Sequence, residues 1–123
     1  MNAMARTGST GSDDVAALLA RIEAGEDVPR AELAAAVRQL AKAFAAQHPG
    51  RSVELRVPPF VAVQAVEGPA HKRGTPPNVV ETEAITWLRV ATGRTDFADE
   101  VGAGTIRATG PRSDLSGYLP VLS

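Results

Sequence analysis

Signals that end helices and strands follow one another closely between Trp87 and Leu119, and they constrain the fold more than any other feature of the sequence. Glycine tolerates the left-handed conformation that ends a helix, and proline cannot continue the hydrogen bonding of a strand. Several short elements must therefore alternate in this stretch. We expect, in order, a helix end at Thr92-Gly93, a short helix from Asp96, a turn at Gly102 to Gly104, a strand from Thr105 to Ala108, a stop at Gly110-Pro111 and a last helix from Ser113.

The first half of the chain is predicted to be helical. Apolar residues three or four positions apart predict two helices within residues 13–48, which break at Gly25 and end at His48-Pro49-Gly50. Residues 1–12 are small, polar and rich in glycine and serine, so they are expected to form a flexible N-terminal arm. The length of 123 residues predicts a single domain over residues 13–123. The residues expected on the buried helix faces are Val15, Leu18, Leu19 and Ile22, then Leu33, Val37, Leu40 and Phe44.

From Ser52 the apolar period changes to two, which is typical of strands. Residues 53–57 alternate apolar and charged side chains, as expected for a strand with one solvated face. Residues 60–66 are apolar on both faces apart from Gln64, which predicts a more central strand that pairs antiparallel with the first. Residues 68–77 contain three prolines and two glycines and are predicted to form a loop. A brief strand over residues 78–81 and a helix starting at Thr82 or Glu83 follow, so residues 52–123 combine strands with helices.

Composition excludes several functional classes. Thirteen basic and fourteen acidic residues give a net charge of −1, which argues against nucleic-acid binding. The chain has no cysteine, so disulfides and thiolate chemistry are excluded. No apolar run approaches the ~18 residues that span a bilayer, and the N-terminus does not have the layout of a signal peptide. We therefore expect no transmembrane segment and a cytoplasmic location.

Two short motifs carry a resemblance to a known family. Ala91-Thr92-Gly93 and the run AGTIRATG at residues 103–110 recur in this order, around a short helix, in the sterol-carrier-protein family of non-specific lipid-transfer proteins. The sequence is most similar to the small actinobacterial branch, where a Pro-Pro-Phe step and a loop like EGPAHKRGTPPNVVE occur. Together with the predicted elements, the resemblance implies an α+β fold with a mostly antiparallel sheet of four to five strands covered on one face by helices. It also implies an apolar cavity between the sheet and the helices.

No set of residues suits catalysis or metal binding. The chain has two histidines, His48 and His71, and neither has the paired spacing of a zinc site or a neighbouring nucleophile. His48 is interpreted as a surface residue at a helix end, where the helix dipole favours it. We therefore predict no catalytic residue, no metal site and no cofactor, and we do not expect an enzyme.

The predicted loop carries a basic cluster, His71-Lys72-Arg73. These side chains could hold a carboxylate, a phosphate or a lipid headgroup, and the prolines around them would reduce the entropy lost on binding. The alternative is a solvated loop tip, which is the usual fate of an isolated charge cluster.

An apolar ligand would need a lined cavity. The residues predicted to line it, together with the basic cluster, are Phe60, Ala62, Val66, Trp87 and Tyr118. Trp87 has an alternative interpretation as an ordinary core residue.

The sequence leaves two functions open. The leading hypothesis is non-catalytic binding or carrying of a small apolar or amphipathic ligand, such as a fatty acyl chain or an isoprenoid. The alternative is an accessory interaction module with a filled core that binds a protein partner or a second copy of itself. A carrier needs a pocket that opens to solvent, whereas a module should expose an apolar patch.

Overall fold

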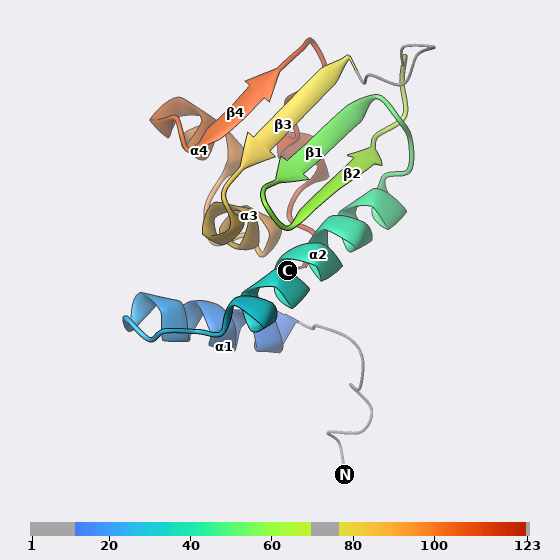
Figure 1. Cartoon of the computed structure of the whole chain (residues 1–123). Helices are drawn as coiled ribbons and strands as arrows, with labels where there is room; N and C mark the ends of the chain where they lie inside the picture. The colour runs from blue at the N-terminus through green and yellow to red at the C-terminus, as the bar shows by residue number, and fades with distance from the viewer. Residues whose placement is uncertain (1–11, 70–76, 123) are drawn as a thin grey trace.

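The computed structural model describes residues 12–69 and 77–122 as a four-stranded sheet with helices (Figure 1). Residues 1–11 of the predicted arm and residues 70–76 of the predicted loop lie outside the described residues. The elements are α1 (Ser12–Glu23), α2 (Arg30–Gln47), β1 (Val53–Val57), β2 (Val61–Ala65), β3 (Asn78–Thr82), α3 (Ala84–Ala91), α4 (Phe97–Ala103), β4 (Ile106–Thr109) and the 3₁₀ turn η2 (Ser116–Tyr118).

The first two helices begin and end where the local signals predict. Gly25 follows α1 with φ +85°, a conformation that glycine adopts without strain. Pro29 precedes α2, and the backbone N–H of His48 closes α2 by donating to the Phe44 carbonyl at 2.9 Å. The two helices meet as an elbow, with α1 crossing the start of α2 (Figure 1).

The strands form one sheet in the order β2-β1-β3-β4. The β1–β2 and β3–β4 pairs are antiparallel and the β1–β3 pair is parallel, so the sheet is mixed but mostly antiparallel, as predicted. The register places Leu55 of β1 opposite both Val63 of β2 and Val80 of β3.

The expectation that residues 60–66 form a central strand was wrong, because β2 lies at the edge of the sheet and β1 is central. The apolar run in β2 reflects small side chains rather than burial on both faces. Ala62 pairs with Arg56 and shares its face, where it is exposed, while Val61 and Val63 are half-buried on the other face.

Helices cover one face of the sheet, as predicted, and the other face carries charged side chains. On β1 and β3 the buried residues Val53, Leu55, Val57 and Val80 face the helices. The opposite face carries two ion pairs. Arg56 pairs with Glu54 at 2.7 Å, and Arg107 pairs with Glu81 at 3.2 Å.

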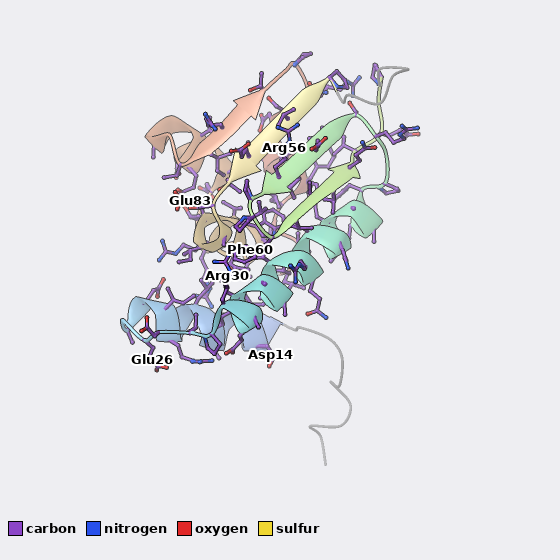
Figure 2. The ribbon with its side chains drawn as sticks, viewed as in Figure 1. Asp14, Glu26, Arg30, Arg56, Phe60 and Glu83 are labelled. Carbon is purple, nitrogen blue, oxygen red and sulfur yellow. The ribbon has the colours of Figure 1, made fainter. Side chains whose placement is uncertain are left out.

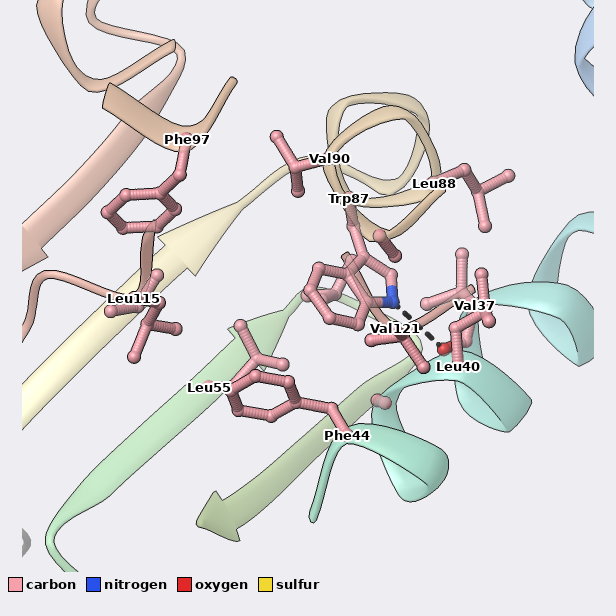
Figure 3. Packing of buried hydrophobic residues seen from close by; sticks show 14 of the residues in the cluster. Val37, Leu40, Phe44, Leu55, Trp87, Leu88, Val90, Phe97, Leu115 and Val121 are labelled. Carbon is pink, nitrogen blue, oxygen red and sulfur yellow. Dashed lines mark hydrogen bonds between the residues drawn. The ribbon is translucent and has the colours of Figure 1, made fainter. Parts of the chain in front are cut away.

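The core between the sheet and the helices is filled around Trp87 (Figure 3). Trp87 is 1% exposed, and its indole Nε1–H donates to the Val37 carbonyl at 3.2 Å. The rings of Trp87 and Phe44 meet edge to face with centroids 6.1 Å apart. Leu88 of α3 and Ile106 of β4 are both buried in this core.

The last helix expected from Ser113 is reduced to the turn η2. Beyond this turn, the chain is held by α3 and α2. The N–H groups of Val121 and Leu122 both donate to the Ala91 carbonyl, and the Gln47 amide donates to the Val121 carbonyl at 3.3 Å. These bonds hold the tail in a non-helical course across the ends of both helices.

Candidate functional site

Phe60 lies beside the first half of α2. The Arg30 guanidinium sits 5.0 Å from the centre of the Phe60 ring, and Arg38 Nε donates to the Phe60 carbonyl at 3.0 Å. Figure 2 shows Arg30 and Phe60 together at the tip of the β1–β2 hairpin. Phe60 therefore fixes the hairpin to α2 through a cation–π contact and a hydrogen bond.

Tyr118 lies at the other end of α2, against His48. The centres of these two rings are 4.9 Å apart. The 18 residues of α2 span about 27 Å, so Phe60 and Tyr118 do not line one cavity. Trp87 belongs to the filled core, and Ala62 points to the charged face of the sheet.

A cavity of about 640 Å³ opens at the Tyr118 end of α2, and we call it the His48–Tyr118 pocket. Of the residues that the sequence predicts for ligand binding, it brings together Val66 and Tyr118. The residues that line it are His48, Pro49, Gly50, Val66, Glu67 and Tyr118.

The wall of this pocket is an unusual backbone turn at Val66. Val66 has φ +69°, which is a true outlier for a β-branched residue. The Val66 N–H donates to the His48 carbonyl at 2.6 Å, and the Val66 carbonyl accepts from the Ser52 N–H at 3.0 Å. Gly50 lies directly against the Val66 backbone, so close that a Cβ on Gly50 would collide with the Val66 carbonyl. Such strained residues persist only where their surroundings hold them, and they cluster at binding sites.

The pocket combines apolar surface with polar groups that make no hydrogen bond to the described residues. The His48 ring stands between Phe44, at a centroid distance of 5.3 Å, and Tyr118. With the described residues, neither the His48 imidazole nor the Tyr118 hydroxyl makes a hydrogen bond, and Glu67 is exposed without an ion pair. A half-buried imidazole and a phenol above an apolar wall suit the polar end of an amphipathic molecule.

Sequence reasoning did not find His48 or Gly50 as pocket residues. In the sequence both are signals that end α2, and in the structure α2 ends at Gln47 with His48 as its cap. Their second role depends on Val66, sixteen positions beyond Gly50 in the chain, which no local pattern connects to them.

Two carboxyl groups outside the pocket, those of Glu100 and Asp114, have a pKa below the ordinary value. A hydrogen bond from the Thr105 hydroxyl, and a second from Thr95 at 2.7 Å, lower the pKa of Glu100. Hydrogen bonds from the Ser116 hydroxyl and N–H lower the pKa of Asp114. Both groups stabilise local turns, at the end of α4 and at the start of η2.

The basic cluster His71-Lys72-Arg73 lies outside the described residues, so its predicted role stays a prediction. Across residues 12–69 and 77–122, no three histidine or acidic side chains gather closely enough to hold a metal ion. In the same ranges, no helix has the length and apolar character to cross a membrane.

The comparison with known families agrees with the fold. A family model described as "Bacterial SCP ortholog" matches residues 29–121, which is most of the chain and includes every strand, α2 to α4 and the whole His48–Tyr118 pocket. No curated protein matches the sequence. The match covers the same turns and strand on which the sequence resemblance rests, and the chain therefore belongs to the bacterial sterol-carrier-protein (SCP) ortholog family.

Proposed function

We propose that this protein is a non-catalytic carrier of an amphipathic lipid, such as a fatty acid or an isoprenoid acid, and that the lipid binds in the His48–Tyr118 pocket. Membership of an SCP family indicates lipid binding or carrying as the general function, because proteins of this kind are typically non-catalytic carriers. The observation that carries the finer proposal is the cavity of about 640 Å³ that opens beside Val66 and Tyr118.

The surface also favours a carrier over an interaction module. A module of this size should expose an apolar patch, yet within the described part of the chain Val101 is the one large apolar side chain that is exposed. A pocket of several hundred Å³ is the feature that a small-molecule site needs. The filled core around Trp87 means that the ligand would occupy the pocket and not the space between the sheet and the helices.

The polar end of the lipid would bind at the edge of this pocket. Tyr118 and His48 offer hydrogen-bonding groups that the described residues leave unused. Glu67 of the pocket directly precedes the predicted loop that carries Lys72 and Arg73. These two cations would attract an anionic end, so an acid should bind better than its neutral ester.

Binding of a fluorescent fatty acid at micromolar concentration tests the proposal. Tyr118→Ala removes a pocket wall and should weaken binding about tenfold, which corresponds to about 1.4 kcal/mol. Phe60→Ala is the matched control, because it removes an aromatic side chain of similar exposure at the far end of α2. Its affinity should stay within about twofold of the native value. Equal loss in the two variants, or no binding by the native protein, would support the interaction module instead.

Charge reversal of the loop tests the position of the polar end. Lys72→Glu with Arg73→Glu should weaken binding of the fatty acid and leave its methyl ester nearly unchanged. An equal effect on acid and ester would contradict the role of the loop in binding the polar end. It would not contradict lipid binding in the His48–Tyr118 pocket.

A further inference from the structure

The imidazole of His48 is held in one place at the wall of the His48–Tyr118 pocket. The backbone N–H of His48 donates to the Phe44 carbonyl at 2.9 Å, and the His48 carbonyl accepts from the Val66 N–H at 2.6 Å. The imidazole lies between two aromatic rings, with centroids 5.3 Å from Phe44 and 4.9 Å from Tyr118. Its position therefore depends on the end of α2, the turn at Val66 and η2, which are far apart in the sequence.

The ring nitrogens of His48 make no hydrogen bond to any group in residues 12–69 and 77–122. The side chain is half-buried and lines the cavity of about 640 Å³. A neutral imidazole has one N–H donor and one acceptor nitrogen, whereas a protonated imidazole has two donors and a positive charge. Protonation of His48 therefore changes the kind of head group that the pocket can bind.

Other ionisable side chains at the pocket belong to residue types that keep their charge near neutral pH. Glu67 and Tyr118 are the other titratable residues of the pocket wall. Two arginines are close by: Arg51 follows the wall in the chain, and Arg112 lies against Gly68, the neighbour of Glu67. Glutamate, tyrosine and arginine ordinarily do not change charge between about pH 5.5 and 8, whereas histidine does. Within the described residues, a pH-dependent charge at this pocket therefore points to the imidazole.

The net charge of the pocket wall depends on the state of His48. With a neutral imidazole, the Glu67 carboxylate is the one charged group among the lining residues, and it repels an anion. With a protonated imidazole the two charges balance, and both ring nitrogens can donate charge-assisted hydrogen bonds. Aromatic rings attract a nearby cation, so the protonated ring can keep its place between Phe44 and Tyr118. An anionic group should therefore bind more tightly when His48 carries the proton.

We infer that His48 is the residue by which the pocket selects the charge of its ligand, and that it links loading of the carrier to pH. Protonated His48 binds an anionic head group, which is a carboxylate, a sulfonate or a phosphate, and neutral His48 favours its release. The inference rests on the proposed function, because it concerns the same pocket and adds the regulation of that site.

Two fluorescent probes with the same alkyl chain test this inference on the full-length protein. One ends in a sulfonate, which stays anionic across the pH range in which a carboxylate would begin to take up protons itself. The other ends in a neutral alcohol and reports the shape of the pocket. The measured quantity is the ratio of the sulfonate affinity to the alcohol affinity. For the native protein this ratio should rise about fivefold as the pH falls from about 8 to about 5.5, because one charged contact is gained.

Two substitutions of His48 and one control separate charge from shape. His48→Gln keeps a polar side chain without the charge, so the ratio should stay at the low value of the native protein at high pH. His48→Lys keeps a positive charge throughout, so the ratio should be high and nearly independent of pH. His71→Gln changes the other histidine of the chain and is the matched control, which should keep the native pH dependence.

The outcomes distinguish this inference from the proposed function. If both probes bind but the ratio of the native protein does not change with pH, the inference is overturned and the carrier function stands. The same holds if the pH dependence survives in His48→Gln or disappears in His71→Gln. If neither probe binds to the native protein at micromolar concentration, the proposed function is overturned, and this inference falls with it.

Discussion

Replacing Gly50 by alanine tests the close backbone contact that forms the wall of the pocket. A Cβ at residue 50 would collide with the carbonyl of Val66 and press on the N–H of Glu67. The clashing atoms belong to the backbone, which cannot turn aside as a side chain can. Gly50 also has φ +153°, which side chains rarely tolerate. Backbone strain costs about 1–3 kcal/mol and overpacking adds about 1–3 kcal/mol, so the substitution should lower the free energy of unfolding by roughly 2–6 kcal/mol.

Two other glycines provide matched controls for the same change. Gly25 has φ +85° and no atom within 4 Å of the position that an alanine Cβ would take, so Gly25→Ala carries only the left-handed penalty of about 1–2 kcal/mol. Gly102 lies in α4 with open space around it and no positive φ, so Gly102→Ala should stabilise the protein by about 0.5–1 kcal/mol. Gly50→Ala should therefore destabilise the protein most, Gly25→Ala less, and Gly102→Ala not at all. This order distinguishes the collision at Gly50 from the left-handed penalty at Gly25 and the helix propensity at Gly102.

Urea denaturation followed by circular dichroism measures these differences, and thermal unfolding gives a second reading. The Gly50→Ala variant should melt roughly 10–20 °C below the native protein and should bind the fluorescent fatty acid more weakly at a temperature where it is still folded. A loss for Gly50→Ala no larger than that for Gly25→Ala would refute the close approach of Gly50 to Val66.

Further substitutions probe the core and one carboxyl group. Leu88→Ala should lower the free energy of unfolding by roughly 2–5 kcal/mol in urea; a loss below about 0.5 kcal/mol would show that Leu88 does not face the core. Trp87→Phe removes the N–H that donates to Val37 and should cost about 1–3 kcal/mol by the same assay, and an unchanged stability would count against that bond. Thr105→Val removes the main cause of the lowered pKa of Glu100. A lowered carboxyl pKa stabilises the fold above the unfolded-state pKa, and this stabilisation is lost as the pH falls through the folded-state value, so this variant should lose less stability on acidification than the native protein. Identical acid titrations of the two proteins would contradict this.

Local signals in the sequence predict the helix ends and the buried face of β1 correctly. Gly25, Gly93 and Gly104 all have positive φ at helix ends, as their positions in the sequence indicate. The alternation in residues 53–57 places Val53, Leu55 and Val57 on the buried face. These features depend on residues within a few positions of each other, where backbone preference and apolar period act directly.

The candidate site is only partly visible in the sequence. Val66 and Tyr118 are expected near a ligand and do line the pocket, but Phe60 lies at the other end of α2 and Trp87 fills the core. The apolar character that suggests a cavity lining is the same character that fills a core, so composition alone cannot separate the two.

The sequence by itself determined the order of the helices and strands as far as β4, the ends of α1 and α2, and the buried faces of α1, α2 and β1. Only the tertiary structure decided the order of the strands, the parallel pairing of β1 with β3, and the pocket. Asn78 illustrates the reason: its buried amide donates to the Ser52 carbonyl at 2.8 Å, and its oxygen accepts from the Arg112 N–H at 2.8 Å. These partners lie 26 and 34 positions away in the chain. Such contacts are selected because a buried polar group must be paired, and the chain satisfies that requirement only after distant segments have met.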